Sequence, residues 1–315
     1  MLAKFAARNP YLYGALVPAM FSWIATAFSI FILHDYNGGV FILIPFFIGA
    51  CSTVLYGKQK PSHTGKYINV ATASLSIYCA GLILFAIEGA ICILMAAPLG
   101  FLMSLIGVAI GQGILSRKRN SSVNIIIGMA ICIPAVMSFE SISKEDEDIF
   151  SVSTSVVIDR KPEVVWKNVV TFSKMEPPSE WLFRAGIAYP TDAVIKRTGG
   201  RTVRYCNFST GCFVEPITTW QEPQLLAFNV EATPRPLQEL SLYNIDPAHL
   251  HGYFVSKKGQ FHLVALPNGK TLLEGTTWYA HKIKPAFYWR IWSNYIIHKI
   301  HNRVLQHIKT QAEAA

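Results

Sequence analysis

Hydrophobic and polar positions divide the chain into two parts with different periods. In the first part, apolar residues form five runs, each close to the ~20 residues that a helix needs to cross a membrane. The runs are residues 13–33, 40–56, 68–87, 96–115 and 123–139. Lipid cannot satisfy backbone hydrogen bonds, so each run is expected to be a helix in a compact bundle. The fifth run is the shortest and contains Asn124 and Pro134, which makes it the weakest of the five.

From residue 150 onward the pattern changes to the two-residue alternation of half-buried strands. Pro162 opens a short helical pattern that ends near residue 172, a second short helix is expected over 180–185, and Pro285 introduces a helix to about residue 312. Turn residues separate the strands, as at 199–200 and 267–269. Strands are predicted over 151–159, 192–197, 201–208, 212–220, 225–231, 260–266 and 271–281.

Residues 158–166, which read Ile-Asp-Arg-Lys-Pro-Glu-Val-Val-Trp, resemble the opening of the START-like superfamily. This superfamily is also called SRPBCC, or polyketide cyclase/dehydrase and lipid transport. The resemblance implies an α+β helix-grip fold in which a curved antiparallel sheet surrounds a long C-terminal helix. It also implies a deep apolar cavity for a lipid, a sterol or a polyketide-like ligand. The expected architecture is a multi-pass α-helical membrane domain (1–140), an acidic linker (141–149) and a START-like domain (150–315).

Composition supports this division. Charged residues make up 15% of the 315 residues, and the mean hydropathy is +0.32. Residues 1–140 contain only 8 Lys and Arg and 3 Asp and Glu. A wholly soluble enzyme is therefore excluded, since soluble proteins carry about 25% charged residues. The net charge of +9 does not form one patch, so no nucleic-acid partner is expected.

The basic residues of the first part predict its orientation, because Lys and Arg are retained on the cytoplasmic side. They lie at the N-terminus (Lys4, Arg8), in the second loop (58–66) and in the fourth loop (117–119). We therefore expect a bacterial-type inner-membrane protein with a cytoplasmic N-terminus and an extracytoplasmic C-terminal domain. If the run 123–139 does not span, the domain is cytoplasmic instead. Glu88 is expected at the end of a span, as an interfacial loop residue.

Two cysteines of the second part lie on either side of a turn. Cys206 and Cys212 are opposite each other if the hairpin is symmetric about Ser209. An external compartment would then permit a disulfide, although cross-strand geometry does not always allow one. Their spacing fits no common zinc or redox motif.

Polar residues on the predicted strands are candidates for contacts with the ligand. These candidates are Tyr205, Asn207, Glu215, Glu274 and Trp278, although alternation does not say which face of a strand points inward. Residues 233–254, rich in Pro, Leu and aromatic residues, form either a lid over the cavity or a packed surface insertion.

His298 and His301 lie three residues apart on the last predicted helix. His301 is the one expected to face the cavity, because Ile297, Val304 and Ile308 surround it on one helical face. With a third ligand from Glu274 or from the possible lid the pair could hold a metal, but polar cavity lining is the stronger interpretation, and neither a metal nor a cofactor is expected.

Three functions remain open from the sequence. The leading one is binding or transfer of a hydrophobic molecule next to a membrane. The second is a cyclase, hydrolase or isomerase acting on an apolar substrate, with His298, His301 and Glu274 as candidate acid/base groups. The third is an interaction domain for a membrane partner, which a domain without a cavity would favour.

Overall fold

The computed structural model describes residues 6–116, 119–143, 148–198, 200–240, 243, 247 and 250–315. Arg117, Lys118, the centre of the acidic linker and most of residues 241–249 lie outside this range, as does Gly199 of the first predicted turn. The chain divides into two compact units. One contains residues 1–146, 239–248 and 283–288, and the other contains residues 147–238, 249–282 and 289–315.

The first unit is helical. Helix α2 (Pro10–Ala27) continues as a π-helical turn (Phe28–Ile32), and a second π-helical turn (Gly39–Leu43) leads into α3 (Ile44–Gln59). The unit continues with α4 (Thr64–Leu84), α5 (Ala90–Leu115) and α6 (Arg119–Ile142). Within the described residues, five helical stretches are long and apolar enough to cross a membrane, which confirms the five runs seen in the sequence. The fifth, over Ser122–Ile142, has a mean hydropathy of 2.0, which lies within the range of 1.6 to 2.4 of the other four.

Helix α3 is the most buried of these helices, and glycines bring it close to α5. A Cβ on Gly49 would lie 2.0 Å from the Ser104 carbonyl oxygen, and one on Gly107 would lie 2.1 Å from the Phe46 carbonyl oxygen. Only glycine allows two helix backbones to approach this closely.

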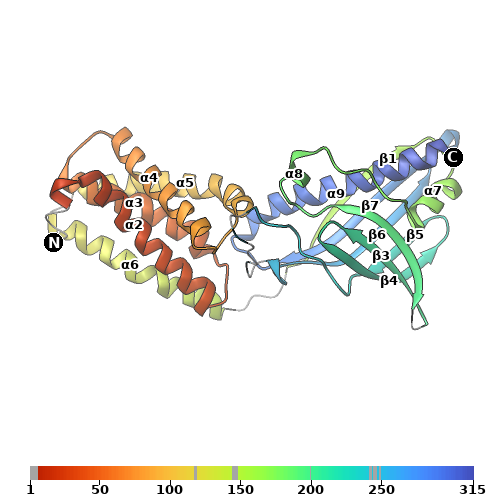
Figure 1. Ribbon diagram of the computed structural model, residues 1–315, viewed down its shortest axis with the longest axis horizontal. Helices are drawn as coiled ribbons and strands as arrows, with labels where there is room; N and C mark the ends of the chain where they lie inside the picture. Colours follow the sequence, from red (N-terminus) through yellow and green to blue (C-terminus); the bar gives the residue numbers. More distant parts are fainter. Residues whose placement is uncertain are drawn as a thin grey trace. The chain divides into compact units, whose positions relative to one another are not determined.

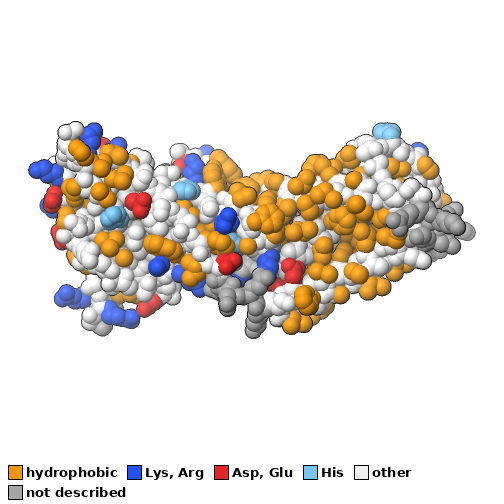
Figure 2. Space-filling model, turned by 180° about the vertical axis from the view of Figure 1, so that it is seen from behind, with side chains coloured by type: hydrophobic (Ala, Val, Ile, Leu, Met, Phe, Trp, Pro, Cys, Tyr) orange, Lys and Arg blue, Asp and Glu red, His pale blue; other side chains and the backbone are white. Residues whose placement is uncertain are grey.

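Apolar side chains gather on the outer surface of the helical unit (Figure 2). Ile131, Phe139 and Ile142 are between 69% and 80% exposed. A water-soluble protein rarely exposes large apolar areas of this kind. The helices thus carry their hydrophobic residues outward as well as inward, as expected for contact with lipid.

The second unit is a seven-stranded antiparallel sheet with a long helix across one face (Figure 1). The strand order is β1-β7-β6-β5-β4-β3-β2. Strand β6 begins six residues before the predicted 260. The strands are β1 (Phe150–Ile158), β2 (Pro190–Thr198), β3 (Arg201–Phe208), β4 (Gly211–Gln221), β5 (Leu225–Asn229), β6 (Phe254–Ala265) and β7 (Thr271–His281).

Helices α7 (Pro162–Val170) and α8 (Trp181–Arg184) follow β1, and α9 (Ala286–Ala314) ends the chain. The core lies between α9 and the sheet, where Leu305 and Ile308 pack among Leu226, Leu273 and other apolar residues. This element order fits the START-like fold expected from residues 158–166.

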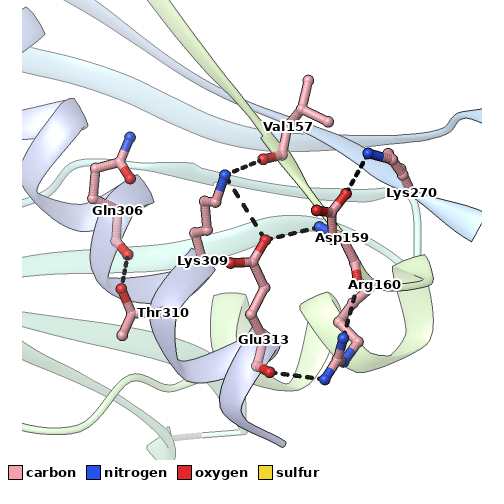
Figure 3. Close-up of polar contacts among 8 residues, drawn as sticks. All are labelled: Val157, Asp159, Arg160, Lys270, Gln306, Lys309, Thr310 and Glu313. Carbon is pink, nitrogen blue, oxygen red and sulfur yellow. Dashed lines mark hydrogen bonds and ion pairs between the residues drawn. The ribbon is translucent and has the colours of Figure 1, made fainter.

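Asp159 and Arg160, at the start of this segment, hold the C-terminal end of α9 (Figure 3). The Asp159 amide donates to Glu313 Oε1 at 2.9 Å, and the Arg160 guanidinium donates to the Glu313 carbonyl oxygen at 2.7 Å. Lys309 Nζ donates to the Val157 carbonyl oxygen at 2.9 Å, and Lys270 pairs with Asp159 at 2.7 Å. The helix is thereby fixed at its end against the turn between β1 and α7.

Candidate functional site

A pocket of about 120 Å³ lies between the sheet and α9. Strands β3 to β7 supply one wall, and α9 supplies the other. Most of its surface is apolar. The lining residues are Arg204, Cys206, Phe208, Phe213, Glu215, Phe228, Val230, Phe254, Ser256, Lys258, Gly259, Gln260, Phe261, Gly275, Thr276, Thr277, Ile297, Ile300, His301, Val304 and Leu305.

A buried ion pair lies in the sheet wall of this pocket. Arg204 on β3 is 2% exposed and donates to the carboxylate of Glu215 on β4, which is 6% exposed. The two residues are opposite each other in the strand register. The guanidinium carbon of Arg204 lies over the rings of Phe172, Phe228 and Phe261, at 5.2 to 5.6 Å from their ring centres. The aromatic faces favour the cation, and Glu215 neutralises it.

Burial and pairing act against each other on the two charges. Desolvation by itself would lower the pKa of Arg204, but the Glu215 carboxylate raises it, so the guanidinium stays charged. Burial raises the pKa of Glu215, and Arg204 opposes this shift. Arg204 Nε has no hydrogen-bond partner among the described residues. The wall of the pocket therefore carries a buried ion pair that is neutral overall.

A second polar group enters the pocket from α9. His301 Nε2 lies 2.8 Å from Thr277 Oγ1 on β7, and His301 Nδ1 lies 3.1 Å from Thr154 Oγ1 on β1. Thr154 Oγ1 also lies 2.7 Å from Nδ1 of the exposed His298. Burial, followed by the nearby His298, lowers the pKa of His301 to about 4. The imidazole of His301 is therefore neutral at pH 7.

Of the residues named from the sequence, Glu215 and His301 line the pocket, and His298 lies on the solvent side of Thr154. Tyr205, Asn207, Glu274 and Trp278 are not among the lining residues. Their assignment to the inner face is wrong for a simple reason. On β3 the even-numbered residues point inward, and on β7 Leu273, Gly275 and Thr277 do so, which turns the intervening candidates to the other face.

The candidates on the outer face have other partners. Asn207 Nδ2 donates to Asp192 Oδ1 at 2.6 Å, and Lys258 Nζ lies 4.5 Å from the ring centre of Trp278. Glu274 is opposite Ser155 and His262 in the strand register. Glu274 therefore does not join the two histidines as an acid/base group or as a metal ligand.

The hairpin between β3 and β4 is not symmetric about Ser209. Its register pairs Cys206 with Phe213 and Asn207 with Cys212, because the turn contains two residues, Ser209 and Thr210. This one-residue difference places the two cysteines on opposite faces of the hairpin. Both are free thiols, and burial raises the pKa of Cys206 to about 12.

The segment 233–254 does not form a lid over the pocket in its described part, where only Phe254 lines it. Instead, Thr210 Oγ1 donates to the Arg235 carbonyl oxygen at 2.6 Å, and the Gln238 amide donates to the Gly186 carbonyl oxygen at 2.8 Å. These contacts hold the start of the segment beside the sheet. Most of its later residues lie outside the described part.

Glu239 from this segment belongs to the helical unit. One of its carboxylate oxygens, one of the Glu88 carboxylate oxygens and Cys92 Sγ lie within 4.8 Å of one another. Glu88 precedes α5 in the loop after α4, at the end of a span as expected. Among the described residues, these three are the His, Cys, Asp or Glu side chains that lie close enough together to hold a metal ion. His298 and His301 do not belong to this group.

Arg204 is the residue that the sequence reasoning missed. An arginine within a strand normally predicts an exposed position. The signal that could have found it is the polar pair Arg204 and Glu215 at corresponding places on the two strands of one hairpin.

No protein-family model matches the chain, and no curated protein matches its sequence. Similar solved structures include truncated norcoclaurine synthase from Thalictrum flavum, with 10% identity and a TM-score of 0.34 over 53% of this chain and 96% of that one. They also include a START superfamily protein from Mycobacterium smegmatis, with 15% identity and a TM-score of 0.31 over 52% and 94%. A third is the di-domain ARO/CYC StfQ of the steffimycin biosynthetic pathway, with 9% identity and a TM-score of 0.35 over 61% and 60%.

START-type structures are thus similar to about half of this chain. At these identities and TM-scores the similarity adds no argument about function.

Proposed function

We propose that this chain is a membrane-anchored START-like protein that binds a hydrophobic molecule with one polar end in the pocket beneath α9. The observation that carries the proposal is the apolar pocket with a buried Arg204–Glu215 pair in its wall. Ligand pockets are typically apolar with a few placed polar groups that orient the ligand. A neutral hydroxyl or carbonyl group suits this pocket wall better than a charged one, because Glu215 already balances the charge of Arg204.

The size of the pocket favours a small ligand. Its volume of about 120 Å³ is below the ~300–1,000 Å³ of typical drug-sized sites. A compact ring system or a single short chain suits this space better than a lipid with two acyl chains. Among the ligand classes implied by the START-like resemblance, the polyketide-like class is the best match.

The anchor and the orientation are part of the proposal. Five apolar helices precede the pocket-bearing unit, and the positive-inside pattern favours an extracytoplasmic position for that unit. Tethering raises the effective concentration of the pocket at the bilayer, where apolar molecules partition. A protein that receives or delivers such a molecule benefits from this arrangement.

The experiment is mass spectrometry of small molecules that co-purify with the full-length protein in mild detergent. Ile300→Trp places a large ring in the pocket beside His301, at a cost of about 1 to 3 kcal/mol for overpacking. The matched control is Ile291→Trp on the same helix, where the isoleucine is 65% exposed. We expect a bound apolar molecule in the wild type and in Ile291→Trp, and its loss in Ile300→Trp. Equal recovery of small molecules from all three proteins contradicts the proposal.

A further inference from the structure

Four side chains form a continuous hydrogen-bonded chain from the pocket to the surface. Thr277 lines the pocket and contacts His301, His301 contacts Thr154, and Thr154 contacts His298. The three distances are 2.8, 3.1 and 2.7 Å, all within hydrogen-bonding range. His298 is exposed, so the chain ends in solvent.

When both histidines are neutral, two proton arrangements make every hydrogen bond point the same way along the chain. A hydroxyl has one proton to donate, and a neutral imidazole has one N–H and one acceptor nitrogen. In one arrangement Thr277 donates to His301 Nε2, His301 Nδ1–H donates to Thr154, and Thr154 donates to His298 Nδ1. In the other, every donor and acceptor is reversed. A proton that enters at one end and a proton that leaves at the other convert the first arrangement into the second.

We propose that Thr277, His301, Thr154 and His298 are a proton relay, and that the pocket exchanges a proton between solvent and an ionisable group of its ligand. The inference rests on the ligand pocket of the proposed function and adds acid/base chemistry to it. It concerns a ligand with a weakly acidic O–H or a basic oxygen, such as a phenol or an enol.

The transfer balances as follows. The ligand O–H bond breaks and its proton passes to Thr277 Oγ1, while the Thr277 proton passes to His301 Nε2. The Nδ1 proton of His301 passes to Thr154 Oγ1, and the Thr154 proton passes to His298 Nδ1. The ligand becomes an anion and His298 a cation, which then releases its Nε2 proton to water. His301 changes tautomer and stays neutral, in accordance with its lowered pKa.

Other ionisable groups at the pocket offer a competing acceptor. Arg204, Glu215 and Lys258 also line it, and the Glu215 carboxylate is the strongest alternative base. Arg204 already pairs with that carboxylate, which reduces its basicity. Variants of the relay distinguish the two routes, because Thr154 does not contact Glu215 by any hydrogen bond among those described for these residues.

The test uses 2-naphthol, an apolar phenol that becomes a much stronger acid on excitation and then emits as naphtholate. Equilibrium dialysis against the full-length protein in detergent measures binding, with Ile300→Trp as the blocked-pocket reference for uptake into detergent. Fluorescence of the bound probe measures proton transfer. We expect a naphtholate band with the wild type. Thr154→Val, which keeps the side-chain shape without the hydroxyl, should bind the probe and lose that band.

His298→Ala is the second relay variant. It changes an exposed side chain and is expected to preserve the fold while also losing the band. The matched control is Ser153→Ala, since Ser153 contacts Thr276 across the same two strands at 2.7 Å but lies outside the relay. This variant should retain both binding and the band.

Each other outcome decides against the inference. Naphtholate emission that persists in Thr154→Val and His298→Ala assigns the proton to another acceptor and overturns the relay. Binding without naphtholate in the wild type overturns the relay and leaves the proposed binding function intact. Wild-type binding no greater than that of Ile300→Trp overturns both.

Discussion

Replacing Arg204 with methionine should destabilise the sheet by far more than a surface arginine does. The substitution leaves the Glu215 carboxylate buried at 6% exposure without its cation. Breaking a buried pair in this way costs about 3 to 5 kcal/mol. Because about 1.4 kcal/mol corresponds to a factor of ten, amide hydrogen exchange of β3 and β4 should become roughly 10²- to 10⁴-fold faster. Hydrogen exchange with mass spectrometry measures this in the full-length protein, separately from the helical unit.

Two further variants make the argument refutable. Arg201, on the same strand as Arg204, forms an exposed ion pair with Glu231, and the two side chains are 67% and 50% exposed. Arg201→Met removes this pair and should lower the free energy of unfolding by only about 0 to 1 kcal/mol. Arg204→Met combined with Glu215→Leu removes both buried charges and should recover most of the lost stability. If Arg204→Met exchanges no faster than Arg201→Met, or if the double variant is as fast as Arg204→Met, the buried-pair argument is wrong.

Three further predictions concern pH, helix packing and orientation. Because the pKa of His301 falls to about 4 in the fold, the unfolded chain binds more protons than the folded chain between pH 4 and 6.5. The free energy of unfolding should therefore decrease by up to about 3 kcal/mol as the pH falls through this range. Chemical denaturation of the wild type and of His301→Gln at several pH values measures this loss, and an equal pH dependence of the two proteins contradicts the prediction. Gly107→Ala should lower the thermal stability of the helical unit, whereas Gly113→Ala should not, because a Cβ at Gly113 meets nothing within 4 Å. A reporter fused to the C-terminus should be active outside the cytoplasm, and activity confined to the cytoplasm would reverse the proposed orientation.

The order and type of the elements could be predicted because each depends on local pattern. Apolar runs of helical length, a proline at the start of α7 and turn residues between strands are all read within a few positions. Strand β6 begins at Phe254, earlier than predicted. The prediction missed this start because Lys257 and Lys258 interrupt the alternation of apolar and polar residues over 254–259. Here pairing with β7 decides the strand, and pairing is not visible in one segment.

The inward face of β3 could not be predicted for a related reason. Its two faces carry Arg204 and Cys206 on one side and Tyr205 and Asn207 on the other, and local hydrophobicity favours neither strongly. The face with Arg204 is buried because Glu215 on β4 and phenyl rings from three other segments surround the guanidinium. Such a cage is assembled from residues up to 89 positions apart, as Phe172 and Phe261 show.

His301 differs from the strand residues because a helix gives more information about its faces. With 3.6 residues per turn, Ile297, Val304 and Ile308 surround position 301 and define one apolar side of the helix. In a strand, successive side chains alternate between two faces, and either face can be the buried one. His301 accordingly lines the pocket, and His298, three positions earlier, reaches the solvent side of Thr154. The relay then depends on β1, which places Thr154 between two residues of α9 that lie one turn apart. A helix pattern alone therefore identifies the histidine at the pocket, while the path from it to solvent requires the strand beside it.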